Sequence, residues 1–183
     1  MKIFAEKIIS RGMYMLDNAT LNQLHELYLS AMAACFKEQQ NNPSMSHLSF
    51  EERFAFLVEA EWLHRRNKRT ERLVRQAGFR LPAAIEDIDY LGKKGITKGE
   101  ILKLSLGNYI KKAQNVFFSG PTGVGKTYLV CALGRAACAQ GFKVIYTRLP
   151  DFFRWTFSVR SNGRQAPIRD RCAKVPLLIL DDW

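Results

Sequence analysis

The segment Gly120–Thr127 restricts the possible folds of this chain more than any other stretch. It reads GPTGVGKT and fits the phosphate-loop pattern G-x-x-x-x-G-K-[ST] at every specified position. An apolar, β-prone run at 116–118 precedes it, and apolar residues at helical spacing follow it over 128–139. The motif therefore lies between a predicted buried strand and the start of a predicted helix, which is the context that a phosphate-binding loop requires.

Three glycines in this segment, at 120, 123 and 125, allow backbone conformations that a Cβ would forbid. Successive N–H groups can then converge on one anion, with the positive end of the helix dipole behind them. Lys126 adds a charge that reaches the β and γ phosphates, and the Thr127 hydroxyl can bind Mg²⁺. A glycine-rich turn that matches by chance is the alternative, but such a coincidence is rare in a chain of this length. The residues expected to contact a nucleoside triphosphate are Gly120, Pro121, Thr122, Gly123, Val124, Gly125, Lys126, Thr127 and Tyr128.

A second set of chemistry-bearing residues lies downstream of the loop. The run 175–180 is almost entirely apolar, which is typical of a parallel strand covered on both faces, and Asp181 and Asp182 follow it. A strand that ends in acids by chance is the alternative, but the phosphate loop lies about one βαβαβ unit upstream. We therefore expect Asp181 to hold Mg²⁺ together with Thr127. Asp182 would orient or activate the attacking water, so Lys126 and Asp182 are the expected catalytic residues.

Between the loop and this strand the pattern alternates. Residues 143–147 read as another strand, and residues 149–159 read as a helix with many aromatic side chains. Strands that alternate with helices favour a parallel sheet. The expected fold class is therefore α/β, a P-loop NTPase with a parallel sheet.

The first part of the chain is predicted to be a small helical module. Apolar residues at three- and four-residue spacing predict a helix over 18–40. A second helix start is sharper, because Ser49 precedes two acids and Glu52 occupies the partner position of a capping box. This helix should extend to about residue 77, where Gly78 supplies a C-terminal stop.

A cluster of basic residues lies between positions 65 and 80, with a single acid among them. On a helix, positions 65, 68, 69, 72 and 75 share one face, and such a stripe can follow a phosphate backbone. The net charge of +11 also favours a polyanionic partner, usually nucleic acid. A solvated face is the alternative for the stripe, and solubility or an acidic protein partner is the alternative for the net charge. The residues expected to bind DNA are Arg65, Arg66, Lys68, Arg69, Arg72 and Arg75.

The composition argues against a membrane-spanning, secreted, zinc-binding or disulfide-rich protein. The hydrophobic share of 47% is that of a soluble globular protein, and no run approaches the ~18 to 20 apolar residues of a membrane span. The first residues include an early acid and no long apolar core, so we expect no signal peptide, no membrane partner and a cytoplasmic location.

The four cysteines form no C-x-x-C pair, which indicates neither a zinc site nor a disulfide framework. Cys131 and Cys138 are predicted to pack as small apolar residues.

Pro82 predicts a domain boundary, because the residue before a proline avoids helical geometry. We expect a helical DNA- or partner-binding module over 1–80 and a linker leading into the nucleotide domain over 81–114. Residues 115–183 are then expected to be the N-terminal part of a P-loop ATPase domain.

Four stretches together carry a family resemblance: residues 48–62, the arginine-rich stretch that ends at 79–83, the loop 120–127, and 177–182. The chain resembles the IstB-like family, the ATP-binding helper proteins of bacterial insertion sequences. That family is similar to the DnaC-type helicase loaders within the AAA+ class. The phosphate loop is shared by very many NTPases, whereas its combination with the preceding helical module is more specific.

The resemblance implies an ATPase that uses ATP and Mg²⁺, assembles on DNA, and recruits and activates a DDE-type transposase. It also implies a homo-oligomer and an N-terminal module that contacts DNA or the partner. By position, Lys126 and Thr127 carry over as nucleotide and Mg²⁺ residues, and Asp181 as the Walker B aspartate. Asp182 stands where many AAA+ proteins have glutamate, and its shorter side chain reaches water differently.

Family members continue well beyond Trp183, with a sensor residue, an arginine finger and a lid. By the family's fold a fourth strand lies between the first and the third, so we expect a gap in the sheet and exposed apolar faces. The expectation is a truncated AAA+ member, incomplete at its C-terminus, that binds ATP weakly and hydrolyses little or none. The alternatives are a DnaC-like helicase loader in DNA replication and a non-catalytic remnant that binds ATP and DNA.

Overall fold

The computed structural model describes residues 18–90, 95–161 and 171–182. The chain divides into two compact units, residues 1–67 and 68–183, and the division falls inside a long helix. In its described part, the first unit contains helices and turns, whereas the second also contains a sheet. The expected division by function, at residues 80 and 114, stays a prediction.

In the first unit, two helices joined by a turn replace the single helix that the sequence predicts over 18–40. Residues 18–26 are helical, and α2 covers Ser30–Asn41. Between them Tyr28 has a φ of +57°, in the left-handed region that L-residues avoid within helices. The prediction of one continuous helix was therefore wrong, although both of its parts are helical.

The short helix η1 (Pro43–His47) leads into α3, which covers Phe50–Ala77. The predicted capping box begins α3: the Glu52 amide donates to the Ser49 hydroxyl (3.2 Å), and the Ser49 amide donates to the Glu52 carboxylate (2.8 Å). At the other end Gly78 has a φ of +73°, which continues the chain out of the helix. Both predicted ends of this helix are confirmed.

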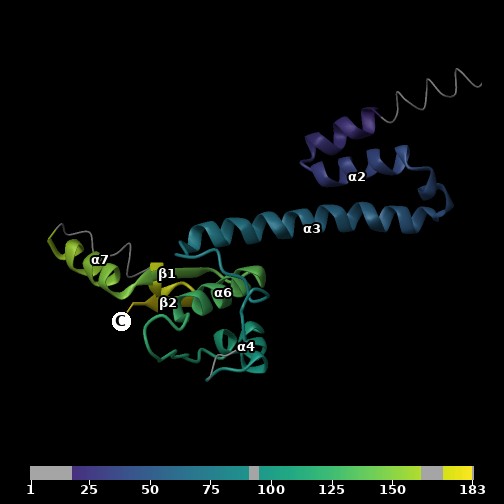
Figure 1. Ribbon diagram of the computed structural model, residues 1–183. Helices are drawn as coiled ribbons and strands as arrows, with labels where there is room; N and C mark the ends of the chain where they lie inside the picture. Colours follow the sequence, from purple (N-terminus) through teal and green to yellow (C-terminus); the bar gives the residue numbers. More distant parts are fainter. Residues whose placement is uncertain (1–17, 91–94, 162–170, 183) are drawn as a thin grey trace, which may run out of the picture. The chain divides into compact units, whose positions relative to one another are not determined.

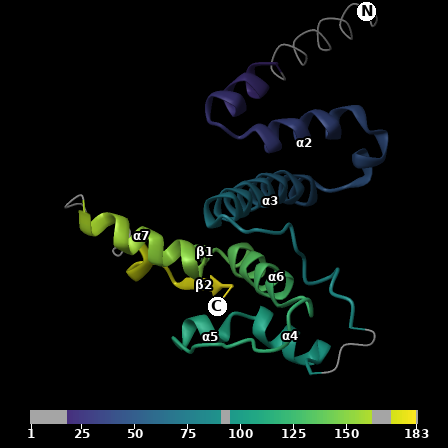
Figure 2. The same cartoon turned by 60° about the vertical axis from the view of Figure 1, so that its left-hand side comes forward.

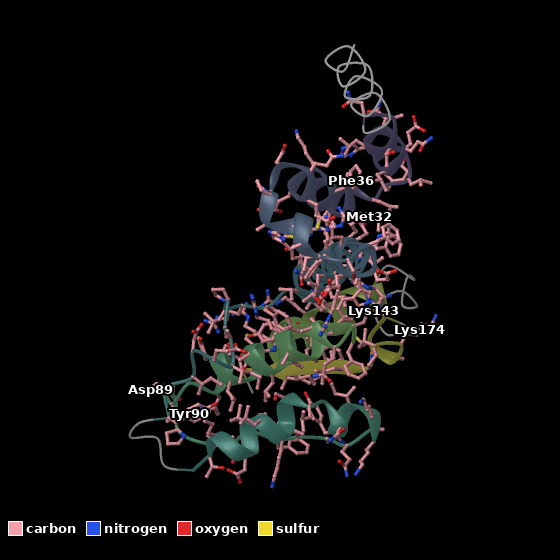
Figure 3. All side chains as sticks on the ribbon, turned by 90° about the vertical axis from the view of Figure 1, so that its right-hand side faces the viewer. Met32, Phe36, Asp89, Tyr90, Lys143 and Lys174 are labelled. Carbon is pink, nitrogen blue, oxygen red and sulfur yellow. The ribbon has the colours of Figure 1, made fainter. Side chains whose placement is uncertain are left out.

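Glu61 of α3 explains the turn before α2. α2 has no side-chain cap of its own, and the Glu61 carboxylate instead accepts from the amides of Ala31 (3.0 Å) and Met32 (3.2 Å). Arg65, one helical turn after Glu61, donates to that carboxylate (2.8 Å) and to the Tyr28 carbonyl (3.3 Å). A buried acid on a different helix thus provides the acceptor that an N-cap residue usually provides. Figure 3 shows Met32 within the helical first unit.

In its described residues, the second unit contains two strands and several helices (Figure 1). After the end of α3 they follow in the order α4 (Lys98–Ser105), α5 (Asn108–Lys111), α6 (Lys126–Ala139), β1 (Val144–Arg148), α7 (Leu149–Ser161) and β2 (Leu177–Asp181). The predicted helices and strands at α6, β1, α7 and β2 are confirmed within a few residues. The short helix α5 was not predicted, because its four residues carry no periodic pattern to detect.

β1 and β2 pair in parallel, with Arg148 opposite Asp181 at their last positions. Lys143 and Lys174, which precede the two strands, lie at the beginning of the sheet (Figure 3). Arg148 and Asp181 therefore mark the carboxyl edge. Parallel α/β sheets bind their ligands outside this edge.

The expected strand at 116–118 is not formed, and that prediction was wrong. Residues 114–121 have no regular secondary structure, and the described part of the sheet consists of β1 and β2. A strand requires a hydrogen-bonded neighbour, and no described strand pairs with these residues. Phe117 is 75% exposed as a result.

α6 lies between the sheet and α4, where it forms the centre of the core (Figure 2). Gly134 of α6 allows the closest approach: a Cβ there would lie 2.5 Å from Phe79 Cε1 and 2.9 Å from Ile179 Cδ1. Cys131 and Cys138 are fully buried on this helix, as predicted. Burial raises the pKa of Cys138 to about 11, so this thiol stays protonated and packs as an apolar group.

Residues 79–88, which follow α3 directly, also contribute to this core. Ala83 is fully buried, and Leu81, Ile85 and Ile88 pack with it against residues of α6 and β1. Phe79 joins both apolar clusters of the second unit. The segment after α3 is thereby attached to the sheet-containing unit by apolar contacts.

Candidate nucleotide site and basic face

The phosphate-loop segment turns directly into α6. Gly123 and Gly125 have φ values of +85° and +91°, in the region that favours glycine. Gly125 is the N-cap residue and offers no side-chain acceptor, so the first amides of α6 lack a side-chain cap. Residues 119–125 are exposed. Uncapped amides at the positive end of a helix dipole, open to solvent, are the arrangement that binds phosphate.

The Lys126 side chain folds back over this loop. Its ammonium group donates to the carbonyl oxygens of Gly120 and Pro121, each at 2.8 Å. Both acceptors are neutral, whereas a phosphate oxygen is charged and forms a stronger hydrogen bond with an ammonium group. The ammonium group is therefore already held at the loop, where an incoming phosphate can replace the two carbonyls.

The remaining residues expected to contact the nucleotide differ from one another in exposure. Pro121, Thr122 and Val124 lie exposed on the loop, and Thr127 is half-buried in the first turn of α6. Tyr128 instead accepts a hydrogen bond from the Ala84 amide (3.4 Å) and packs in the apolar core. The hydroxyl of Tyr128 thus contacts the 79–88 segment.

Asp181, the last residue of β2, is fixed by a tyrosine of the neighbouring strand. The Tyr146 hydroxyl donates to Asp181 Oδ2 at 2.7 Å. Burial raises the pKa of Tyr146, and the hydrogen bond to Asp181 raises it further. The phenol therefore stays protonated and acts as a donor, which leaves the other Asp181 oxygen for a further ligand. The sequence pattern did not identify Tyr146, because only the strand pairing brings it to Asp181.

Asp182 has a different partner. Its Oδ2 accepts from Arg80 Nη1 at 3.0 Å, and both side chains are about half exposed. Asp182 also has a φ of +55°, which directs its backbone away from the strand direction. The two adjacent carboxylates thus differ: a buried phenol orients Asp181, and a surface arginine pairs with Asp182.

Cys131 connects the loop end of α6 with the carboxyl edge of β2. It lies one turn after Thr127, so both are on the same face of the helix. Burial raises the pKa of Cys131, the nearby negative charge of Asp181 raises it as well, and Arg80 lowers it. Thr127 and Cys131 therefore share a face of α6, and the charge of Asp181 acts on the Cys131 thiol.

A cavity of about 540 Å³ opens beside β1, next to the residues that hold the two carboxylates. Its walls include Tyr146 and Arg80, the partners of Asp181 and Asp182, but none of the residues 120–128. The phosphate loop itself is an exposed surface, as expected for a site that binds a highly charged group through backbone amides.

The six basic residues expected to bind DNA fall into two groups. Three have partners within the chain: Arg65 pairs with Glu61 (2.8 Å), Arg66 lies over the Trp62 ring (5.2 Å), and Arg69 donates to the Gly141 carbonyl (3.5 Å). Gly141 follows the C-terminus of α6, where a positive charge is favoured by the helix dipole. These three arginines thus have structural contacts of their own.

Lys68, Arg72 and Arg75 form the second group, and all three are exposed on α3. At 100° per residue they lie within about 60° of one another around the helix. The buried side chains Leu73 and Ala77 lie on the opposite side of the same helix. These three cations therefore form a basic face that points away from the core of the second unit.

The residues of the loop and of the sheet edge fit a nucleoside triphosphate with Mg²⁺. The loop offers exposed amides and the Lys126 cation, and Thr127 and Asp181 offer the oxygen ligands that Mg²⁺ prefers. Within the described ranges, no group of three or more His, Cys, Asp or Glu could hold a metal ion by itself. Mg²⁺ at a phosphate site needs few protein ligands, because phosphate oxygens and water complete its shell.

A glycine loop that enters an uncapped helix, beside a parallel strand that ends in aspartate, defines a P-loop ATPase domain. The profile of one family agrees with this class over most of the chain: the IstB-like ATP binding protein family matches residues 22–183. The chain belongs to this family.

Related proteins carry names that agree with the family. One named as an ATP-binding protein of insertion sequence IS1162, from Pseudomonas fluorescens, is 39% identical over 92% of this chain and 74% of its own length. The insertion-sequence ATP-binding protein y4pL of Sinorhizobium fredii is 37% identical, over 92% of this chain and 69% of that protein. An insertion-sequence ATP-binding protein of Mycobacterium tuberculosis is 30% identical, over 91% of this chain and 66% of that protein.

Among the described residues, none of the helices has the length and apolar character of a membrane span.

Proposed function

We propose that this chain is an ATP-binding protein of the AAA+ type that assists DNA transposition: it binds DNA and activates a transposase through ATP-dependent assembly. One observation carries the proposal: Lys126 and uncapped amides begin α6 beside an Asp-ended strand, in a chain of the IstB-like family. Relatives named for insertion sequences support the transposition role. The proposed location is the cytoplasm, and the proposed partners are DNA, a transposase and further copies of the chain.

In the proposed nucleotide cycle, bound Mg²⁺–ATP supplies the phosphoanhydride bond that is hydrolysed. Lys126 moves from the carbonyls of Gly120 and Pro121 to phosphate oxygens and neutralises their charge. Thr127 and Asp181 would hold the Mg²⁺ ion, and Asp182, once released from Arg80, would orient the attacking water.

The proposed DNA contact is the basic face formed by Lys68, Arg72 and Arg75. The exposed cations can each neutralise a phosphate, because they have the spacing of one helical face. Arg65, Arg66 and Arg69 contribute charge to the same helix while they keep their contacts within the chain. Because these contacts do not read base edges, binding should depend strongly on salt and weakly on sequence.

The test is the salt dependence of DNA affinity. The logarithm of the DNA association constant falls linearly with the logarithm of the salt concentration. Replacing Lys68, Arg72 and Arg75 by glutamine should make this line less steep by about 3, if each side chain contacts one phosphate. The matched control replaces Lys98, Lys111 and Lys112, which lie on or next to α4 and α5, and has the same net charge. Equal slopes for the two triple variants would refute the DNA contact proposed for this face.

A further assay tests the transposition role itself. The purified chain should retain a transposase of its own insertion sequence on an affinity column in the presence of ATP. Retention of a replicative helicase in place of the transposase would instead support the helicase-loader alternative and refute this role.

A further inference from the structure

The cavity beside β1 has its own walls, separate from the phosphate loop. Its volume of about 540 Å³ is in the range of small-molecule sites in proteins. The described residues that line it all belong to the second unit: they come from the end of α3 and the residues after it, from β1, from the first turns of α7, and from 171–172. The cavity is therefore a candidate binding site in addition to the loop before α6.

The charge of this cavity comes mainly from arginines. Among the described residues that line it, Arg80, Arg148 and Arg171 are cationic and Asp151 is acidic. Asp151 already pairs with two arginines, with Arg148 at 2.8 Å and with Arg154, which does not line the cavity, at 3.3 Å. One carboxylate cannot balance the cations around it, and a cleft with an excess of one sign attracts ligands of the opposite charge. The cavity therefore favours an anion.

These arginines can turn to a ligand at little cost. The side chains of Arg80 and Arg148 are 51% and 46% exposed, so solvent screens their pairs with Asp182 and Asp151. Arg171 is exposed and forms no ion pair with the described residues. A guanidinium group matches the geometry of a phosphate and can donate two hydrogen bonds to it. Phosphate is therefore the anion that these three side chains fit.

An aromatic side chain stands in the same wall. Trp155 is 39% exposed, and it follows Asp151 by one turn of α7, so both residues lie on the same face of that helix. Ile145 and Ala77 add apolar surface to the cavity. Bases stack on aromatic side chains of this kind with little regard to their identity. Cations beside an indole ring and apolar walls fit a nucleotide better than they fit phosphate alone.

The cavity also lies next to the basic face of α3. Gln76, one of its lining residues, follows Arg75 directly and Arg72 by one helical turn. A nucleic-acid strand on the basic face can therefore reach the cavity, as can a free nucleotide.

We propose that this cavity binds a nucleoside monophosphate unit. Its phosphate contacts Arg80, Arg148 and Arg171, and its base lies against Trp155. The unit is either a free nucleotide or one nucleotide of a DNA strand, and the second source rests on the DNA contact proposed above. The site itself does not depend on ATP binding, because none of the residues 120–128 lines it.

Isothermal titration calorimetry of the full chain with AMP tests the phosphate contacts. AMP should bind the unaltered chain, and Lys126→Ala should bind it equally well, because the phosphate loop takes no part. Arg171→Gln should weaken AMP binding by about tenfold, the effect of losing a charge-assisted hydrogen bond. Arg154→Gln is the matched control: it removes the same charge from outside the cavity wall and should bind AMP normally.

A second ligand separates the base from the phosphate. Trp155→Leu should weaken AMP binding by about tenfold, because the base loses its stacking partner. It should leave the binding of inorganic phosphate unchanged, whereas Arg171→Gln should weaken both ligands. Competition identifies the source: displacement of AMP by a single-stranded thymidine oligonucleotide would assign the cavity to DNA, and AMP binding unaffected by it would assign the cavity to a free nucleotide.

Three results would overturn the proposal. One is a chain that binds no AMP at millimolar concentration. Another is AMP binding that Lys126→Ala abolishes, because the phosphate loop would then be the site. The third is an equal loss of affinity in Arg171→Gln and Arg154→Gln, which would reduce the effect to net charge. Circular dichroism of every variant should match the unaltered chain, and ATP binding, measured in parallel, reports separately on the proposed function.

Discussion

The hydroxyl of Tyr146 on β1 donates to the carboxylate of Asp181 on β2 at 2.7 Å. The hydrogen bond joins neighbouring parallel strands near their carboxyl edge. It holds one oxygen of Asp181 and leaves the second for another ligand. In metal sites such supporting hydrogen bonds orient the ligand, and their loss lowers metal affinity. Tyr146 is therefore a positioning residue for the proposed Mg²⁺ site.

Tyr146→Phe removes this donor with little change of shape. We expect the Mg²⁺ concentration needed for half-maximal ATP binding to rise by about tenfold, because Asp181 loses its orientation. ATP binding without Mg²⁺ should change little. A titration of Mg²⁺ against a fluorescent ATP analogue measures both quantities.

Tyr109→Phe is the matched control, because it removes a phenol hydroxyl from α5 in the same unit. It should leave the Mg²⁺ requirement unchanged. If Tyr146→Phe also leaves that requirement unchanged, Tyr146 has no part in positioning Asp181.

Glu61 should make the first unit sensitive to acid. Burial alone would raise its pKa, but hydrogen bonds from Arg65, Met32 and Ala31 outweigh burial and hold the pKa below the ordinary value of 4.5. Because the folded pKa lies below the unfolded one, the stabilisation is complete above pH 4.5. It is lost as the pH falls below that value toward the folded pKa.

Glu61→Gln should therefore lower the free energy of unfolding by about 1–3 kcal/mol at pH 7. The difference between Glu61→Gln and the unaltered chain should shrink as the pH falls below 4.5. Urea unfolding followed by circular dichroism at pH 7 and at pH 3.5 measures it. A difference that is constant over this range would show that Glu61 is not charged in the folded state.

Gly134 should tolerate no side chain. Alanine there would meet Phe79 and Ile179 at 2.5 and 2.9 Å, so packing strain of about 1–3 kcal/mol should exceed the gain in helix propensity. Gly99 of α4 is the control, because its nearest neighbour outside the local backbone is 4.0 Å away. Gly99→Ala should stabilise the chain by up to about 1 kcal/mol. Urea unfolding of both variants tests this contrast, and equal effects would contradict it.

Substitutions of Asp182 and of Arg80 should have different effects on the rate of ATP hydrolysis. Asp182→Asn should lower the single-turnover rate of ATP hydrolysis by about 10²-fold, with an unchanged dissociation constant for ATP. Arg80→Gln should change the stability by less than about 1 kcal/mol, because the ion pair is half exposed. It should not slow hydrolysis. Equal losses of rate in both variants would mean that the ion pair, and not the released carboxylate, is required.

The sequence predicted a helix end correctly where that end depends on residues a few positions apart. Both ends of α3 were found in this way, the first from Ser49 with Glu52 and the last from Gly78. The turn at Tyr28 carries no glycine or proline signal in the sequence. It depends on Glu61, which only the folded first unit brings to α2.

The same distinction applies to the candidate site. The loop glycines and Lys126 could be identified from spacing alone, since the motif is contiguous. The partners of the two carboxylates could not: strand register brings Tyr146 to Asp181, and packing of the 79–88 segment brings Arg80 to Asp182. Periodicity marked Arg65 as part of a basic stripe, but its contact with Glu61 is a property of the fold.

The central claim is that the loop before α6 binds a triphosphate through Lys126 and the amides of its first turn. Binding of a fluorescent ATP analogue to Lys126→Ala tests it most directly, with Lys143→Ala, at the other edge of the sheet, as control. We expect Lys126→Ala to weaken binding by roughly 10- to 100-fold, the effect of losing a charged hydrogen bond, and Lys143→Ala to bind normally. Unchanged affinity in Lys126→Ala would contradict the claim.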